Sequence, residues 1–331
     1  MKIFLIVLAV LVVLGGGAVF WLYGMDKSAP VEESSTTQTS TPASTSTTPA
    51  TTSTAKSSGT WKQVGPAVSG SFADADTVKL AENSYRLYYA IQPEVVGNKF
   101  EVYSATSTDG KTWTQESGTR KTSATFPEVV KLVDGKFRLY FQSGGVIKSA
   151  MSTDGLTFTD EAGTRIDKIN DLGLTFDNVA APTVLSLTDG TFVMVYRGTI
   201  NTPYAGEKVP NPNTQILLWA TSTDGLTWTK KGMAIDSRII LYGLADGPEL
   251  FVSDDDSIKL SFWSYQGVYW STFANNSFSA PEKVFAIAES TKLNKFPTPT
   301  PGDPTYAKFN GAWYMYYGQK DGIYYATAIA K

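Results

Sequence analysis

Apolar and polar side chains alternate along short segments throughout residues 60–331, which is the periodicity of half-buried β-strands. These segments are rich in the aromatic and β-branched residues that favour strands, and turn residues separate them at short intervals. No segment in this range has the apolar spacing of an amphipathic helix, so the pattern predicts an all-β fold. The clearest strands read YRLYYA (85–90), FRLYFQ (137–142), FVMVYR (192–197), IKLSFW (258–263) and WYMYYG (313–318).

An internal repeat organises these strands. Five similar segments precede the aromatic strands: DADTVKL (74–80), FPEVVKL (126–132), APTVLSL (181–187), GPELFV (247–252) and DPTYAKF (303–309). Three turns further along the repeat are nearly identical: SATSTDGKTWT (104–114), SAMSTDGLTFT (149–159) and WATSTDGLTWT (219–229). Five copies of a four-stranded unit predict a five-bladed β-propeller.

The STDG turns are expected to be structural. Their aspartates, Asp109, Asp154 and Asp224, can accept backbone N–H bonds and brace a tight turn. The aromatic residue that follows each turn can pack between neighbouring sheets.

The fifth copy ends at Lys331 without a fourth strand. The segment Thr60-Trp61-Lys62-Gln63 resembles the strand after the third STDG turn, so residues 60–68 are predicted to supply the outer strand of blade five. This pairing would close the ring and remove its exposed edges. The predicted propeller therefore spans residues 60–331.

The first 59 residues have a different composition. Residues 3–25 carry no charge and are long enough to form a single transmembrane helix, with Lys2 favouring a cytoplasmic N-terminus. The alternative is a cleaved signal peptide, which would give a secreted protein. Residues 26–59 form a linker in which Ser and Thr dominate, and this linker is predicted to be disordered. Either reading places the propeller outside the cell.

Composition narrows the chemistry. The chain has no Cys and no His, which excludes disulfides, thiolate metal sites and catalytic triads that need either residue. Any general acid or base must then be Asp, Glu, Lys or Tyr. The net charge of −3 lacks the basic excess that nucleic-acid-binding proteins carry, so the sequence does not indicate nucleic-acid binding.

Carboxylates recur at the start of the predicted inner strands, which converge at one mouth of the channel. Like charges in a narrow channel raise the pKa of at least one acid, and a protonated acid beside a carboxylate is what glycoside hydrolysis requires. Capping of turns or binding of a structural cation such as calcium stays open as an alternative role. The candidate catalytic residues are Asp74, Asp76, Glu128, Asp246 and Glu249. The candidate substrate-binding residues are Arg197, Asp177, Asp303, Tyr196 and Trp263.

The strand starts, the RLYY-type second strands and the S-T-D-G-x-T-[WF] turns together resemble the five-bladed propeller glycoside hydrolases, namely glycoside hydrolase family 43 and the related invertase-like family. The resemblance covers residues 60–331. It implies that Asp74 or Asp76 acts as base or nucleophile and that Glu128, Asp246 or Glu249 acts as acid. In those families the acid is a blade-three Glu, often before Gly-Pro or Ala-Pro. Blade three here reads Ala180-Ala181-Pro182, and the nearest match is Asp246-Gly247-Pro248 in blade four.

The sequence thus predicts a membrane-tethered glycosidase that acts on oligo- or polysaccharide, is monomeric and needs no cofactor. A glycan-binding or adhesion propeller without catalysis is the alternative, which the missing blade-three Glu favours. A sialidase is a third reading. Five blades and only six Arg argue against it, because sialidases have six blades and an arginine cluster.

Overall fold

The computed structural model describes residues 61–93, 95–206, 208–209, 213–286 and 300–328. Over these residues the chain forms five antiparallel sheets and a single helical turn, α1 (Ser237–Ile240). The predicted all-β, five-bladed propeller is therefore confirmed. The predicted transmembrane segment and the Ser/Thr-rich linker lie outside the described residues. Within the described residues, no helix is long and apolar enough to cross a membrane.

Each sheet is one blade, and its strands run outward in chain order except in blade five, where the first strand of the chain is outermost. The innermost strands are β2 (Phe72–Ala81), β6 (Thr125–Lys131), β10 (Phe176–Ser186), β14 (Asp246–Val252) and β19 (Gly302–Phe309). The second strands are β3 (Ser84–Ile91), β7 (Phe137–Ser143), β11 (Phe192–Pro203), β15 (Ile258–Ser264) and β20 (Ala312–Gln319). The third strands are β4 (Val102–Ser107), β8 (Val146–Ser152), β12 (Asn213–Ser222), β16 (Gly267–Ala274) and β21 (Gly322–Ala328). The outer strands are β5 (Thr114–Gln115), β9 (Thr159–Asp160), β13 (Thr229–Ile235), β17 (Ser277–Phe278) and β1 (Trp61–Ser69), while β18 (Glu282–Phe285) also pairs with β16.

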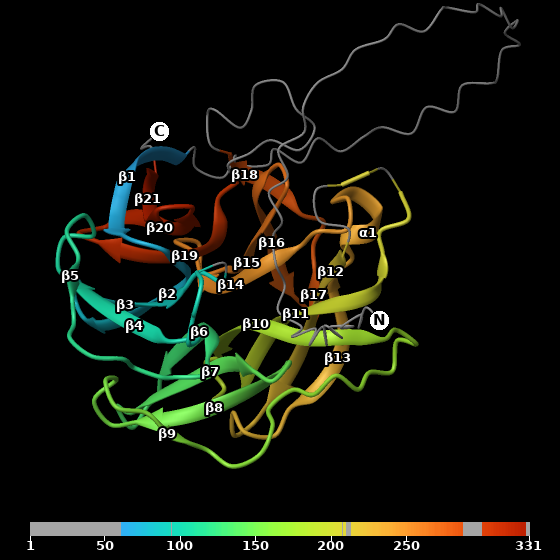
Figure 1. Cartoon of the computed structure of the whole chain (residues 1–331), viewed down its shortest axis with the longest axis horizontal. Coiled ribbons are helices and arrows are strands. Elements are labelled where there is room, and N and C mark those ends of the chain that lie inside the picture. Colours follow the sequence, from blue (N-terminus) through green and yellow to red (C-terminus); the bar gives the residue numbers. More distant parts are fainter. Residues whose placement is uncertain (1–60, 94, 207, 210–212, 287–299, 329–331) are drawn as a thin grey trace, which may run out of the picture.

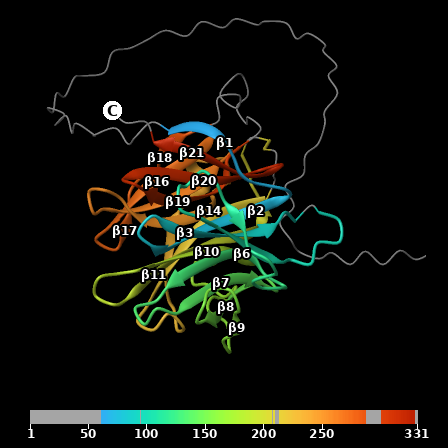
Figure 2. The same ribbon diagram turned by 90° about the vertical axis from the view of Figure 1, so that its left-hand side faces the viewer.

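The five inner strands surround the centre of the molecule, and their labels gather there in both views (Figures 1 and 2). Each inner strand contacts the inner strands of the two neighbouring blades, which closes the ring. The ring is completed by the two ends of the described chain, because β1 pairs with β21 from Trp61↔Ala328 to Ser69↔Gly322. In Figure 1 the blue first strand lies beside the red last strands. The predicted closure of blade five by the segment around Trp61 is therefore correct.

The hydrophobic core is divided among the spaces between blades. Among the described residues it forms five clusters, and each cluster joins side chains of two adjacent blades. Between blades one and two, for example, Val78 and Tyr88 pack with Leu139. No blade has a core of its own, so each blade is stabilised by burial against its neighbours.

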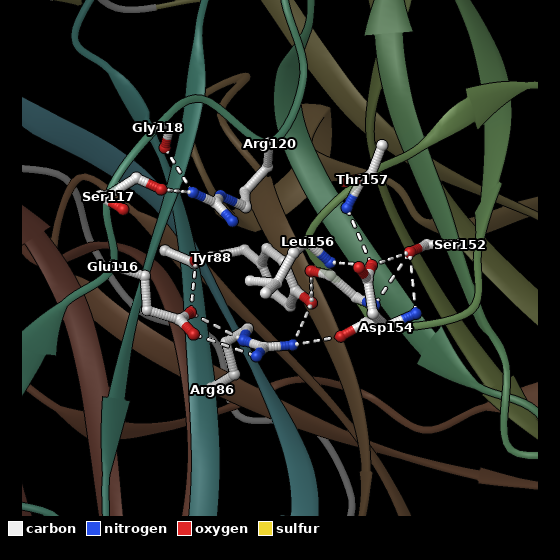
Figure 3. A network of polar contacts seen from close by, with 12 residues as sticks. Arg86, Tyr88, Glu116, Ser117, Gly118, Arg120, Ser152, Asp154, Leu156 and Thr157 are labelled. Carbon is white, nitrogen blue, oxygen red and sulfur yellow. Dashed lines mark hydrogen bonds and ion pairs between the residues drawn. The ribbon is translucent and has the colours of Figure 1, made fainter.

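The STDG turns hold adjacent blades together, as Figure 3 shows for blades one and two. Asp154 accepts the backbone N–H groups of Leu156 and Thr157 and thereby fixes the turn. Tyr88 of the preceding blade donates its hydroxyl to the Gly155 carbonyl at 2.8 Å, and Arg86 donates to the Asp154 carbonyl at 3.1 Å. The same contacts recur one blade further on, where Arg138 and Tyr140 bind Asp224 and Gly225. The aromatic residue after each turn packs edge-on against the same tyrosines, as Phe158 does on Tyr88.

Candidate functional site

The mouth of the channel is built from one backbone irregularity that occurs in every inner strand. The pairing register between the first and second strand shifts at this point in all five blades, which marks a β-bulge. The bulged residue has a positive φ in each case: Asp74, Phe126, Ala181, Gly247 and Asp303, with φ between 45° and 54°. Four of these are non-glycine residues, for which this conformation is uncommon and costs energy, and such strain often accompanies functional sites.

These five residues line a shallow depression at the mouth, with a cavity volume of about 20 Å³. Prolines follow four of the five bulges, at Pro127, Pro182, Pro248 and Pro304, and they stiffen the rim. Blades one and five place an aspartate at the bulge, and blade four places Asp246 immediately before it. The bulges therefore bring Asp74, Asp246 and Asp303 together from strands that are distant in sequence.

Each mouth carboxylate has a different partner. Asp246 forms an ion pair with Arg197 at 2.6 Å, and both side chains are almost completely buried. The Arg197 guanidinium also lies over the Phe126 ring at 4.7 Å. Asp74 accepts the backbone N–H of Phe126 at 3.2 Å. Asp303, which is partly exposed, accepts the indole N–H of Trp263 at 3.3 Å.

Asp303 is the mouth acid whose pKa is raised. Burial at the narrow mouth raises the pKa of Asp303 well above its usual value of 3.8, and the negative charges of Asp74 and Asp246 raise it further. The close approach of Asp303 depends on Gly247, because a Cβ atom at residue 247 would lie 2.2 Å from Asp303 Oδ1. A carboxyl group with a raised pKa therefore stands beside two other carboxyl groups, one of them paired with an arginine.

A second ring of side chains crosses the channel two residues further along each inner strand. It consists of Asp76, Glu128, Thr183, Glu249 and Thr305, which are 0–9% exposed. In four of the five steps the side chain accepts the backbone N–H of the residue that follows its counterpart in the next blade, as Asp76 does from Val129 at 2.7 Å. In the remaining step the Thr305 hydroxyl donates to Glu249 Oε1 at 2.9 Å. We call these five residues the channel belt.

The three acids of the belt face one another, and one oxygen from each lies within 4.8 Å of the other two. Burial raises the pKa of Asp76 to about 7. Burial also raises the pKa values of Glu128 and Glu249 well above the usual value for a glutamate. The charge of Asp76 raises both of them further. The spacing of the three oxygens also suits a hard cation such as calcium, which prefers carboxylate ligands. Protonation and cation binding are two ways of relieving the same repulsion.

The belt predicts that the protein loses stability as the pH rises. The unfolded chain releases the protons of these acids near pH 4, whereas in the folded protein Asp76 retains its proton up to about pH 7 and the pKa of the two glutamates is raised as well. The free energy of unfolding should then fall between about pH 4 and pH 7, by on the order of 4 kcal/mol for a three-unit shift. The substitution Glu128→Gln keeps the carbonyl that accepts Val184 N–H and removes one charge, so it should flatten this dependence and stabilise the protein at pH 8. Urea unfolding across this pH range measures both effects.

The exposed Asp171 provides the matched control, because Asp171→Asn removes a charge without touching the channel. A stability curve with the same slope in the wild-type and Glu128→Gln proteins would show that the belt acids do not titrate as described.

The structure places the other predicted site residues as follows. Arg197 and Trp263 occupy equivalent positions on the second strands of blades three and four, and both contact mouth carboxylates. Asp177 lies away from the mouth: its side chain is exposed, and its carbonyl accepts Lys168. Tyr196 is 3% exposed and packs in the core between blades two and three. Asp177 and Tyr196 therefore do not join the group at the mouth.

Two residues of this arrangement were not predicted. Thr305 completes the belt in blade five, and Phe126 contributes the apolar face of the mouth. Alignment of Pro304-Thr305 with Pro127-Glu128 would have found Thr305, and it would also have placed Asp303 at the position of Asp74. The turn between the first two strands of blade five is shorter, so the sequence alone did not fix the alignment of blade five with the other blades. In the structure Thr305 lies opposite Tyr316 in the strand pairing.

No protein-family model matches the chain, and neither does any curated protein. Solved structures do match. One carries the description "The GH130 family of mannoside phosphorylases contains glycoside hydrolases that target beta-1,2 mannosidic linkages in Candida mannan"; it is 14% identical, with a TM-score of 0.60 over 82% of this chain and 94% of the other. A glycosyl hydrolase from Bacteroides ovatus is 16% identical, with a TM-score of 0.56 over 78% and 84%. A third, described as a glycoside hydrolase, is 13% identical, with a TM-score of 0.58 over 82% and 93%. At these identities the likeness shows the fold, and it confirms that the predicted resemblance to propeller glycoside hydrolases holds for the architecture.

Proposed function

We propose that the protein hydrolyses glycosidic bonds at the mouth of the propeller channel. One observation carries the proposal: Asp303, a carboxyl group whose surroundings raise its pKa, stands beside Asp74 and the arginine-paired Asp246 in a depression open to solvent. Paired acids in unlike states are the machinery of glycoside hydrolysis. The fold shared with solved glycoside hydrolases supports the same conclusion.

Each group has a role in this mechanism. Asp303 donates its proton to the oxygen of the leaving sugar as the bond from that oxygen to the anomeric carbon breaks. Asp74 acts as nucleophile or as base toward water, so that the hydroxyl of water ends on the anomeric carbon and its remaining proton on a carboxylate. Asp246 and Arg197 keep a fixed charge pair at the rim, and Phe126 and Trp263 offer apolar faces to the sugar ring.

This assignment differs from the one expected from sequence. There Glu128, Asp246 or Glu249 was expected to be the acid. Glu128 and Glu249 bind within the belt, and Asp246 forms the ion pair with Arg197, whereas Asp303 is the mouth acid whose surroundings raise its pKa. Asp74 keeps its predicted role, and Asp76 belongs to the belt.

A substrate screen tests the proposal. The full chain is incubated with aryl glycosides and with neutral and acidic polysaccharides, and released reducing sugar is measured alongside binding to the same polymers. Hydrolysis of at least one substrate class is the expected result. Saturable binding without hydrolysis would replace the enzyme by a glycan-binding propeller, which is the second function that the sequence predicted.

We further propose that residues 3–25 anchor the propeller to the membrane and that the linker holds it outside the cell. The support is the uncharged length of this segment, which suffices to span a bilayer. N-terminal sequencing of protein extracted from membranes should then begin at Met1. A mature N-terminus near Val19, found in the culture medium, would instead show that the segment is a cleaved signal peptide.

A further inference from the structure

A second pocket opens between blades four and five. Its volume is about 500 Å³, within the range of small-molecule sites. The inner strand β14 begins at the channel mouth, and the pocket includes Ser253 and Asp254, which follow the other end of this strand. The pocket therefore opens on the face opposite the channel mouth. Its walls include five aromatic side chains, Trp61, Phe251, Trp270, Tyr306 and Trp313.

The pocket lies where other blades receive an STDG turn. The turn of blade two packs on Arg86 and Tyr88 of blade one. In the pairing of the first and second strands, Tyr88 lies opposite the belt residue Asp76. By the same register, the counterparts in blade four are Lys259 and Ser261, and Lys259 lines the pocket. In blade five the third and fourth strands, β21 and β1, come from opposite ends of the described chain, so no STDG turn joins them there. Among the described residues, the mixed closure of the ring thus places no STDG turn in this groove.

The walls combine flat apolar faces with hydrogen-bonding groups. Trp270, Trp313 and Phe251 are partly exposed, with Phe251 and Trp313 edge to face at 5.7 Å. The Trp270 indole donates to the Tyr306 hydroxyl at 2.8 Å, which fixes both rings. Aromatic rings held rigidly in this way can stack on the C–H faces of a pyranose, while hydroxyls and carboxylates at the rim bind its hydroxyl groups.

The charge at the rim selects among sugars. Asp254, Asp255 and Glu282 all line the pocket. Two lysines offset part of this negative charge. Lys308 pairs with Asp254, and its Nζ lies 5.7 Å from the centroid of the Trp313 ring. Lys259, the basic residue of the lining, donates to Thr272. An anionic sugar would meet a net negative rim, whereas a neutral sugar finds several acceptors for its hydroxyl groups. Residues 26–60, which precede Trp61, contain no aromatic residue that could substitute for the aromatic side chain of an STDG turn.

The geometry points to a second carbohydrate site in this pocket, which binds a neutral saccharide of one or two stacked units and is separate from the channel mouth. Its function would be to hold a neutral polysaccharide against the propeller. The inference goes beyond the hydrolysis proposed for the channel and does not require it.

The test uses the full chain carrying Asp303→Asn, so that no substrate is consumed. Titration calorimetry measures binding of trisaccharides of glucose, mannose, xylose and arabinose, with trigalacturonate as the anionic probe. At least one neutral trisaccharide should bind, and trigalacturonate should bind more weakly. Adding Trp313→Ala should weaken binding about tenfold or more, in keeping with the loss of a stacking ring. Glu282→Trp, at an exposed position of β18, should block the pocket without removing a core side chain.

Two controls separate pocket from channel. Trp313→Phe keeps a ring and should retain most of the affinity, while Phe100→Ala removes an exposed aromatic residue of blade one and should change nothing. In the chain with Asp303 intact, the Trp313 and Glu282 variants should hydrolyse a small aryl glycoside at the wild-type rate. Absence of binding by every neutral trisaccharide at about 10 mM would overturn the proposal, as would affinity unaffected by both pocket variants. The two proposals fail separately. Loss of binding in the pocket does not affect hydrolysis at the mouth, and a protein without hydrolytic activity would still bind the saccharide in the pocket.

Discussion

Replacement of Asp303 by Asn is expected to lower kcat by a factor of about 10² to 10⁴, because the variant has no proton to donate to the leaving oxygen. The amide has nearly the shape of the protonated acid and can still accept the Trp263 indole N–H, so the fold should be unchanged. Asp74→Asn should cause a loss of similar size. Steady-state kinetics on a substrate found by the screen, with circular dichroism on the same preparations, measures both effects.

The pH dependence gives an independent check on Asp303. Activity needs this carboxyl group in its protonated form, so kcat/KM should fall as the pH rises through the raised pKa of Asp303. An aryl glycoside with a very good leaving group needs little proton donation, and it should lose much less rate in Asp303→Asn than a poor leaving group does. A uniform loss for both substrates would show that Asp303 positions the substrate and does not donate the proton.

Asp177 provides the matched control. The same substitution there, Asp177→Asn, changes an exposed carboxylate of blade three that lies away from the mouth, so kcat and KM should keep their wild-type values. If Asp303→Asn were as active as Asp177→Asn, the assignment of the acid would be wrong.

Deletion of residues 61–69 is expected to unfold the propeller. This segment is β1, which carries the whole outer edge of blade five and buries Trp61 and Val68 in two different interblade clusters. Burial of side chains of this size contributes about 1.5–3 kcal/mol each, and the lost pairing with β21 adds to this. The total is comparable to the entire stability of a typical domain, about 5–15 kcal/mol. Thermal unfolding of the full chain with and without the deletion measures the effect.

Deletion of nine residues from the Ser/Thr-rich linker, 40–48, provides the control of equal length and should leave the melting temperature unchanged. Trp61→Ala gives a graded version, for which a loss of about 3–5 kcal/mol is typical of a large buried aromatic residue. A β1 deletion that melts like the intact chain would mean that the ring is stable without its closing strand.

The sequence by itself determined the strands, their grouping into five repeats and the closure of the ring. These features depend on short-range chemistry: alternating side chains select one face of a strand, and the Ser-Thr-Asp-Gly turn is stabilised by its own Asp side chain. The match of the Trp61 segment to the strand that follows an STDG turn sufficed to place β1 beside β21. Because each blade repeats the same local pattern, recognition of one copy helps to locate the others.

The division of the channel acids into a mouth and a belt was decided by the tertiary structure. Asp74 and Asp76 are two residues apart and look equivalent in sequence. Both accept a backbone N–H of blade two, but the bulge places Asp74 at the mouth and Asp76 in the belt. The raised pKa of Asp303 depends on its burial and on charges from blades one and four, and the position of its side chain depends on the absence of a side chain at Gly247. The backbone conformation at the bulges, the burial of the acids and the charges on neighbouring strands all arise from the packing of segments that are distant in sequence. No local sequence pattern encodes them.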